Sequence, residues 1–149
     1  MGFRHYETPT FIMPSVAERA WAAGFFDGEG CFSVKDRATD GRPTQVQMVV
    51  TQCDDGEFHL ERFKKAVGNL GYIRLDKPHG TNKKAPWRWF ANRLNEVQMV
   101  TAALWPYLGP TKKNKILSVM GELKQHYVEH PDRTRTLKQK RLEPAPISA

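Results

Sequence analysis

Residues Ala22 to Gly30 read AAGFFDGEG, an apolar run that is punctuated by three glycines and ends with two acids. Upstream, Ser15 and Glu18 have the spacing of a capping box, in which the two side chains reciprocally satisfy free N–H groups of a helix. A helix is therefore expected to begin near Ser15. The run lacks proline and is apolar on every face, which predicts a helix that is buried all round and stops near Gly28 and Gly30.

The two acids of this stretch, Asp27 and Glu29, would lie at the helix C-terminus. Unpaired carbonyls already give that end partial negative charge, so a carboxylate there is disfavoured by roughly 0.3–1 kcal/mol unless a positive charge compensates it. Carboxylates and backbone carbonyls are the hard oxygen ligands that Mg²⁺ or Ca²⁺ prefers. The pattern therefore indicates a divalent cation at this helix end.

Small residues recur every four positions along the same helix, at Ala20, Gly24 and Gly28. A glycine inside a helix costs about 1 kcal/mol relative to alanine. In one interpretation Gly24 accommodates a core aromatic and Gly28 caps the helix. In the other, two such helices pack against each other and bring two copies of Glu29 together. The chain holds one copy of the motif, so the second helix would come from another copy of the chain, in a homodimer.

The AAGFFDGEG stretch resembles the signature of the LAGLIDADG homing endonucleases. Ala22 stands at the family's first leucine, Gly24 at its glycine, Asp27 and Glu29 at its two acids, and Gly30 at its closing glycine. Glutamate in place of the commoner aspartate keeps the carboxylate and lengthens its reach. Further stretches look like the single-motif members over roughly residues 15–128: VTQ at 50–52, GYIR at 71–74, and WPYL at 105–108 before a lysine cluster.

The composition agrees with a protein that binds nucleic acid. The chain has 149 residues, a formal net charge of +7 and a pI near 9.6, which favours an acidic partner. Its two cysteines, Cys31 and Cys53, lack the spacing of a metal site and are expected to be free thiols in a reducing compartment, with a disulfide as the alternative. The sequence shows neither a signal peptide nor a 20-residue apolar span, so we expect no membrane association and an intracellular location, in the cytoplasm, nucleoid or an organelle.

Alternating polar and apolar residues predict four short strands of one antiparallel sheet. They fall at 31–35, 45–51, 72–76 and 87–92, and the turn-rich residues 36–43 form the first hairpin loop. The inward set is Phe32, Val34, Val46, Met48, Val50, Ile73, Leu75, Trp87, Trp89 and Ala91.

Three further helices are expected between and after the strands. Asp54 with Glu57, and Asn95 with Gln98, form possible capping pairs for helices that end near residues 67 and 105. The last helix is expected over 111–128, with one apolar face made of Ile116, Met120, Leu123 and Tyr127.

These elements predict an α+β protein of the LAGLIDADG homing endonuclease fold, αββαββα, with a four-stranded antiparallel DNA-binding sheet. The endonuclease domain would span residues 14–128. Residues 1–13 show no period, and residues 129–149 are polar, basic and contain proline, so both ends are expected to be flexible.

Polar residues dominate the outward face of the predicted sheet and its first loop. Arginine and lysine donate to guanine edges, glutamine and asparagine pair with adenine, and a β-ribbon fits the major groove. A solvated sheet face would look equally polar, and the family resemblance favours DNA contact, with each protomer reading half of a pseudo-palindrome. The candidate DNA-binding residues are Ser33, Lys35, Arg37, Gln45, Gln47, Thr51, Tyr72, Arg74, Asp76, Arg88, Phe90 and Asn92.

The resemblance also implies a catalytic apparatus for hydrolysis of two phosphodiester bonds. Glu29 of each protomer and the Gly28 carbonyl would bind Mg²⁺, with Ca²⁺ or Mn²⁺ as substitutes, between the scissile phosphates and the attacking waters. Gln52 would orient water, although alone it reads as a surface residue. Lys112 would stabilise developing phosphate charge or assist proton transfer. Lys113 is the reserve, because residues 109–110 are an insertion that shifts the register.

Asp27 is instead assigned to structure, as an acceptor for backbone N–H groups near the helix end. Several family members have a basic residue four positions after the glutamine, where this chain has Gly56. Arg62 or Lys64 could substitute for it. The predicted function is a site-specific homing endonuclease that cuts double-stranded DNA. The alternatives are a maturase that binds intron RNA and a DNA-binding regulator that does not cut.

Overall fold

The computed structural model describes residues 12–35, 45–78 and 84–129, and the expectations for Arg37, the first hairpin loop and most of both termini fall outside them. The elements are α1 (Val16–Glu29), β1 (Gly30–Lys35), β2 (Gln45–Gln52), α2 (Gly56–Ala66), β3 (Tyr72–Leu75), β4 (Trp87–Ala91), α3 (Leu94–Leu104), a 3₁₀ turn (Trp105–Tyr107) and α4 (Pro110–Glu129). This order confirms the predicted α+β architecture of helix, hairpin, helix, hairpin, helix and helix. Among the described helices, none is both long and apolar enough to cross a membrane.

The four strands form one antiparallel sheet in the order β1-β2-β4-β3. The pairing places Gly30 opposite Val50 and Val50 opposite Trp89. Val46, Met48 and Val50 are buried in strict alternation along β2, as the sequence predicts. Since side chains alternate between the faces of a strand, the residues between them lie on the opposite face.

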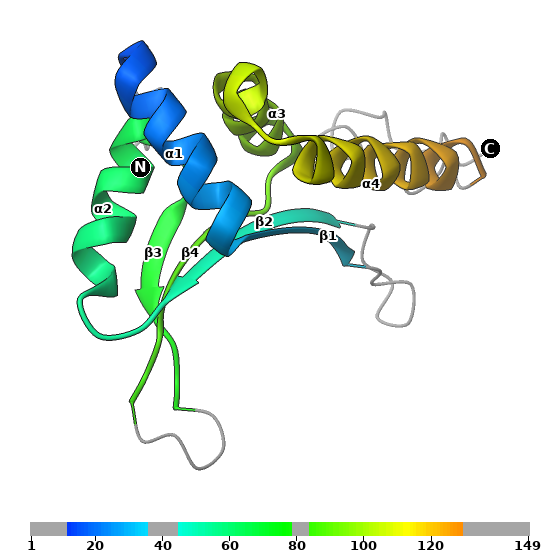
Figure 1. Ribbon diagram of the computed structural model, residues 1–149. Helices are drawn as coiled ribbons and strands as arrows, with labels where there is room; N and C mark the ends of the chain where they lie inside the picture. Colours follow the sequence, from blue (N-terminus) through cyan, green and yellow to red (C-terminus); the bar gives the residue numbers. More distant parts are fainter. Residues whose placement is uncertain (1–11, 36–44, 79–83, 130–149) are drawn as a thin grey trace, which may run out of the picture.

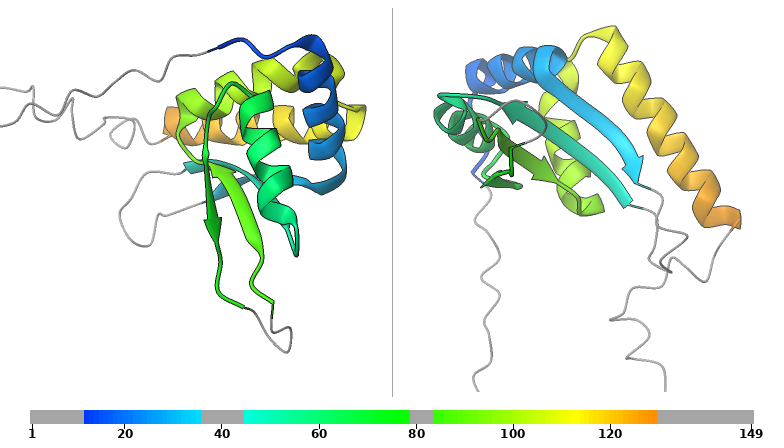
Figure 2. Two further views of the ribbon diagram at one scale, coloured as in Figure 1. Left: turned by 90° about the vertical axis from the view of Figure 1, so that its left-hand side faces the viewer. Right: turned by 90° about the horizontal axis from the view of Figure 1, so that it is seen from below.

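All four helices lie on one side of the sheet, and no helix among the described residues crosses the other side (Figures 1 and 2). The helices α1, α3 and α4 contact β2, and α2 contacts β2, β3 and β4. The largest side chains of the core between these two layers are Trp89, Phe26, Phe32 and Phe63. The Trp89 indole stacks edge-on against Phe63 with 4.8 Å between centroids, and its Nε1–H donates to the Leu70 carbonyl at 2.9 Å. The buried polar atom is therefore satisfied.

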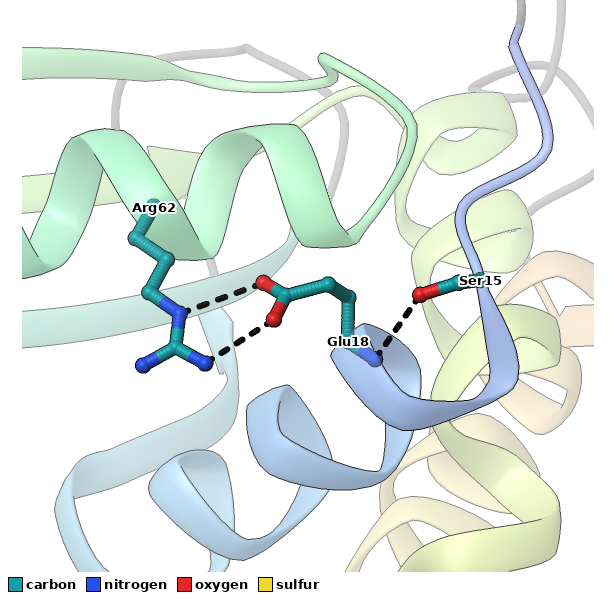
Figure 3. A network of polar contacts seen from close by, with 3 residues as sticks. All are labelled: Ser15, Glu18 and Arg62. Atoms are coloured by element: carbon teal, nitrogen blue, oxygen red, sulfur yellow. Dashed lines mark hydrogen bonds and ion pairs between the residues drawn. The ribbon is translucent and has the colours of Figure 1, made fainter.

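The N-terminus of α1 forms half of the predicted capping box (Figure 3). The Ser15 hydroxyl accepts from the Glu18 N–H at 3.2 Å. The Glu18 carboxylate does not return to Ser15 but accepts two bonds from Arg62 of α2, at 2.9 and 3.1 Å, and the Arg62 guanidinium lies 3.9 Å from the centre of the Trp21 ring. The hydrogen bonds from Arg62 lower the pKa of Glu18, and they raise the pKa of Arg62 in turn.

The predicted capping pairs of α2 and α3 are wrong. The N-cap residue of α2 is Asp55, whose side chain makes no capping hydrogen bond. Asp54 has a positive φ of 54° and forms an ion pair with Lys84 at 2.7 Å. That hydrogen bond raises the pKa of Lys84. The helix α3 already begins at Leu94, so Asn95 lies within its first turn.

Exposure differs from the prediction on α1 and at the end of β3. The helix α1 is not buried all round, because Ala20, Gly24 and Gly28 face outward. The helix also continues past Gly28 to Glu29, so Gly28 does not cap it. A Cβ at Gly24 would meet nothing within 4 Å, so Gly24 does not make room for a core aromatic ring. Leu75 was expected inside but is 54% exposed, since β3 is the edge strand and ends there.

The last helix buries Ile116, Val119 and Leu123 and half-buries Met120 against the core. Three of these four residues were predicted, and Val119 was not. The side chain of Tyr127 lies outside the described part. The helix packs on β1 and β2, so it reaches the sheet edge opposite to α2.

Replacement of Gly71 by alanine tests the turn that precedes β3. Gly71 has φ +77°, and an added Cβ would lie 2.6 Å from Trp89 Nε1 and 2.8 Å from the Phe90 carbonyl. Left-handed strain of roughly 1–2 kcal/mol and overpacking of roughly 1–3 kcal/mol both act here. We expect Gly71→Ala to lower the free energy of unfolding by about 2–5 kcal/mol in urea titrations.

The matched control is Gly121→Ala in α4, where an added Cβ meets nothing within 4 Å. Alanine should stabilise that helix by up to about 1 kcal/mol. Equal stability of Gly71→Ala and the parent chain would contradict the packing described here.

Candidate nucleic-acid interface and metal site

The junction between α1 and β1 presents Glu29 to solvent. Gly30 caps α1 by donating its N–H to the Phe26 carbonyl, and the chain continues directly into β1. A Cβ at Gly30 would collide with the Phe26 ring, so the close approach of backbone and ring requires glycine. Glu29 is exposed and forms no hydrogen bond or ion pair with another described residue. A loop-free turn therefore holds an exposed carboxylate at the helix C-terminus.

Lys112 of α4 reaches this junction. Its Nζ donates to the Gly30 carbonyl and lies 5.6 Å from the centre of the Phe26 ring. Lys113, the reserve candidate, instead lies over the Trp105 ring at 5.4 Å. The structure thus brings Lys112 rather than Lys113 to the end of α1, where its charge offsets the partial negative charge of the helix end. Its predicted catalytic role stays a prediction.

Asp27 has a structural partner. Its Oδ2 accepts a hydrogen bond of 2.9 Å from the N–H of Gly109, the residue just before α4 begins at Pro110. The carboxylate therefore joins the C-terminal end of α1 to the N-terminal end of α4, whose free N–H groups favour a negative charge. This contact fits the structural role predicted for Asp27, although its partner lies on a distant segment and not on α1 itself.

Gln52 ends β2 two residues after Val50, which lies opposite Gly30, so Gln52 and Glu29 share one end of the β1-β2 hairpin. Its Nε2 donates to the Thr51 carbonyl at 3.0 Å. A Cβ at Gly56 would lie 2.5 Å from the Cβ of Gln52, so a basic side chain at position 56 would displace the glutamine.

Arg62 does not replace the missing basic residue, because it binds Glu18 near the opposite end of α1. Glu18 and Glu29 are eleven positions apart along the helix, about 16 Å at 1.5 Å per residue.

One protomer offers few metal ligands. The Glu29 carboxylate and the carbonyls at the end of α1, that of Gly28 included, have the oxygen chemistry that Mg²⁺ prefers. Yet residues 12–35, 45–78 and 84–129 contain no group of three His, Cys, Asp or Glu that could hold a metal ion. Mg²⁺ is usually bound by one or two carboxylates together with water and phosphate oxygens. The residues therefore fit a cation that is completed by ligands from outside the protomer.

The helix-free face of the sheet carries the predicted DNA-binding residues in rows across the strands. Ser33 lies opposite Gln47, Lys35 opposite Gln45, and Thr51, Arg88 and Arg74 form a third row. Cys31 and Val49 lie opposite each other on the same face and were not predicted, although the alternation of the strands indicates them. Both cysteines are free thiols, as predicted.

Several of these residues are bound to one another. The backbone carbonyl of Asn92 accepts a hydrogen bond of 2.7 Å from the Gln45 side chain. The side-chain Oδ1 of Asn92 accepts one of 2.9 Å from the Tyr72 hydroxyl. Phe90 was expected as an exposed contact, but it is only 8% exposed, because Tyr72 stacks edge-on against it at 4.4 Å and Arg74 lies 4.8 Å over its ring. Asp76 is likewise engaged, by Arg74 and Arg88.

The small-residue ridge of α1 is uncovered among the described residues. Ala20, Gly24 and Gly28 are exposed, and a Cβ at either glycine would meet nothing within 4 Å. The ridge ends at Glu29, so the bare helix surface and the free carboxylate are adjacent.

An antiparallel sheet with one face covered by helices and a basic outer face thus ends beside an exposed carboxylate on an exposed ridge of small residues. Residues 22–118 match the family model described as LAGLIDADG endonuclease, and the chain belongs to that family. This confirms the predicted resemblance. The search of curated proteins found no match.

Solved structures of homing endonucleases share the fold. The chain is 19% identical to I-CeuI in a complex with DNA, covering 86% of this chain and 62% of that one, with a TM-score of 0.58. It is 20% identical to I-CvuI in complex with its target in the presence of Ca, covering 70% and 64%, with a TM-score of 0.54. It is 16% identical to I-GzeII in complex with a DNA target, covering 83% of this chain and 40% of that one, with a TM-score of 0.59. The chain therefore spans less than two thirds of each of these proteins.

Substitutions at Asp27 test the link between α1 and α4. Asp27→Ala leaves the Gly109 N–H without its acceptor, so we expect the free energy of unfolding to fall by roughly 1–3 kcal/mol. Asp27→Asn keeps an acceptor oxygen, so its free energy of unfolding should fall by less than that of Asp27→Ala. Urea unfolding of both variants measures the difference, and equal losses would show that the hydrogen bond is not what Asp27 contributes.

Proposed function

We propose that this chain is a site-specific DNA endonuclease that acts as a homodimer and makes a double-strand break in a long pseudo-palindromic target, with Mg²⁺ as cofactor. The observation that carries the proposal is the bare ridge of α1 that leads directly to an exposed Glu29. Membership of the LAGLIDADG endonuclease family supports the same activity.

Close packing of two copies of α1 along Ala20, Gly24 and Gly28 would bring two Glu29 carboxylates together. Small residues allow two helix backbones to approach closely, and a symmetric pair buries the same patch on both protomers. Each sheet would then face one half of the DNA target, so the symmetry of the protein would be matched by a pseudo-palindrome. The net charge of +7 favours the phosphate backbone.

The residues at the junction would divide the chemistry of phosphodiester hydrolysis. Glu29 and the Gly28 carbonyl would bind the cation, which when bound neutralises charge on the entering and leaving oxygens. Gln52 would orient the attacking water from the end of β2. Lys112, fixed beside Glu29 through the Gly30 carbonyl, would place its ammonium group near the scissile phosphate.

Glu29→Gln is expected to lower the rate of cleavage at least about 10³-fold while DNA affinity falls little. The amide keeps the shape of the side chain but removes the charge that would bind the metal. The target would first be selected from a randomised DNA pool incubated with the protein and Mg²⁺. Cleavage and binding are then measured on that target.

The charge-matched control is Glu122→Gln on the exposed side of α4, which should cut normally. Normal cutting by Glu29→Gln would disprove the metal assignment. If no member of the pool is cut while structured RNA binds tightly, the maturase alternative replaces the nuclease. Specific duplex binding without cutting would instead support the regulator.

Gly24→Leu tests the homodimer. A side chain at position 24 points into open space in the protomer, so the variant should fold, but it would block close contact between two ridges. We expect a folded monomer by sedimentation, with cleavage lost. Gly121→Leu, also in open space on α4, should leave the dimer intact. A dimeric, active Gly24→Leu variant would rule out this interface.

A further inference from the structure

Asp76, which follows β3, lies on the sheet face that carries the candidate DNA-binding residues. Its side chain is 10% exposed. Its backbone N–H donates to the Pro86 carbonyl at 2.9 Å, which continues the pairing of the β3-β4 hairpin beyond the two strands. Asp76 is therefore held in place by its backbone and is largely covered, unlike a side chain that reaches toward a base.

Two arginines cover the Asp76 carboxylate. The Nε of Arg74 donates to Oδ1 at 2.7 Å, and the Nε of Arg88 lies 2.9 Å from Oδ2 as an ion pair without hydrogen-bond alignment. Arg74 and Arg88 are direct partners across β3 and β4. Like charges directly opposite each other destabilise a sheet, so the carboxylate compensates a repulsion that the register imposes.

Each arginine is restrained in a second way. Arg74 packs over the Phe90 ring, which also makes an edge-on contact with Tyr72, its direct partner across β3 and β4. Arg88 lies between β2 and β3, opposite both Thr51 and Arg74, and is 30% exposed against 57% for Arg74. The carboxylate contacts Nε of each guanidinium. Among the described residues, no hydrogen bond involves the terminal guanidinium nitrogens of Arg74 or Arg88, so these nitrogens would be available to a ligand above the sheet.

We propose that Asp76 is a positioning residue that holds Arg74 and Arg88 as a paired reader of guanine in each half-site. This inference rests on the proposed DNA-cleaving function and assigns Asp76 a different role from the direct DNA contact that the sequence analysis expected. Arginine reads guanine by two parallel bonds to O6 and N7, which requires a fixed fork. Restraint before binding reduces the side-chain entropy lost when the contact forms.

Loss of the Asp76 carboxylate should raise the affinity for unrelated DNA and lower the discrimination between bases. Asp76→Asn removes one negative charge per protomer and releases both arginines, which can then bind phosphates without regard to sequence. We expect tighter binding to unrelated duplexes and a steeper dependence of affinity on salt, by roughly one unit of slope for each additional phosphate that a released arginine neutralises. At the guanine positions read by the pair, discrimination against other bases should fall by at least about fivefold.

The experiment measures binding of the dimer, in Ca²⁺ to prevent cutting, to the selected target and to a set with each base pair changed singly. Glu61→Gln on α2 adds the same charge away from the sheet face and should keep the base preferences. The loss in Asp76→Asn should be confined to positions that Arg74→Ala or Arg88→Ala also relaxes. Adding Asp76→Asn to the Arg74→Ala, Arg88→Ala double variant should cause no further loss there.

A purely structural role for Asp76 would lower stability and weaken all binding together, so urea unfolding of each variant accompanies the measurements. Unchanged base discrimination in a stable Asp76→Asn variant would overturn the inference and leave the nuclease proposal intact. A uniform loss at every position would also overturn it. Absence of specific duplex binding by the parent chain would instead refute the proposed function.

Discussion

The contact between Gly30 and the ring of Phe26 is the constraint on which the rest of the site depends. It allows the chain to turn from α1 into β1 with no intervening loop, so the last helical carboxylate and the first strand residue are fixed together. Helix α4 returns to the same point, through Lys112 at the Gly30 carbonyl and Gly109 at the Asp27 carboxylate. Three elements thus determine where Glu29 lies.

This convergence also resolves the electrostatic anomaly of two acids at a helix C-terminus. Asp27 lies against the N-terminal end of α4, where a carboxylate is favourable, and Lys112 adds a positive charge beside the terminal carbonyls. Only Glu29 is left without a compensating partner among the described residues. The two acids look equivalent in the sequence, yet the fold gives Asp27 a structural partner and leaves Glu29 exposed at the position of the proposed cation.

The sequence predicted what depends on local pattern. Alternation found the strands and their buried faces, and the order of elements followed from it. It failed where a distant segment decides the outcome. The Glu18 carboxylate accepts hydrogen bonds from Arg62, 44 residues away, instead of completing the capping box. Asp54 likewise forms an ion pair with Lys84 instead of capping α2. The choice between Lys112 and Lys113 was open because it depends on a contact across 82 residues, and Phe90 is covered only because Tyr72 and Arg74 are brought beside it by strand pairing.

The helix-free face of the sheet consists of two parts with different order. On β3 and β4, Arg74, Arg88 and Tyr72 are held by neighbouring side chains. On β2, Gln45 donates to the Asn92 carbonyl, whereas the side chains of Ser33 and Gln47 form no hydrogen bond with other described residues. Ordering a free polar side chain at an interface costs about 0.5–1.5 kcal/mol, and a side chain already restrained avoids most of that cost. If this face binds DNA as proposed, the β3-β4 part would therefore favour rigid discrimination between bases. In the proposed complex, Ser33 and Gln47 would adapt their hydrogen bonds to different base pairs, so recognition by one protomer would not be equally strict along its half-site.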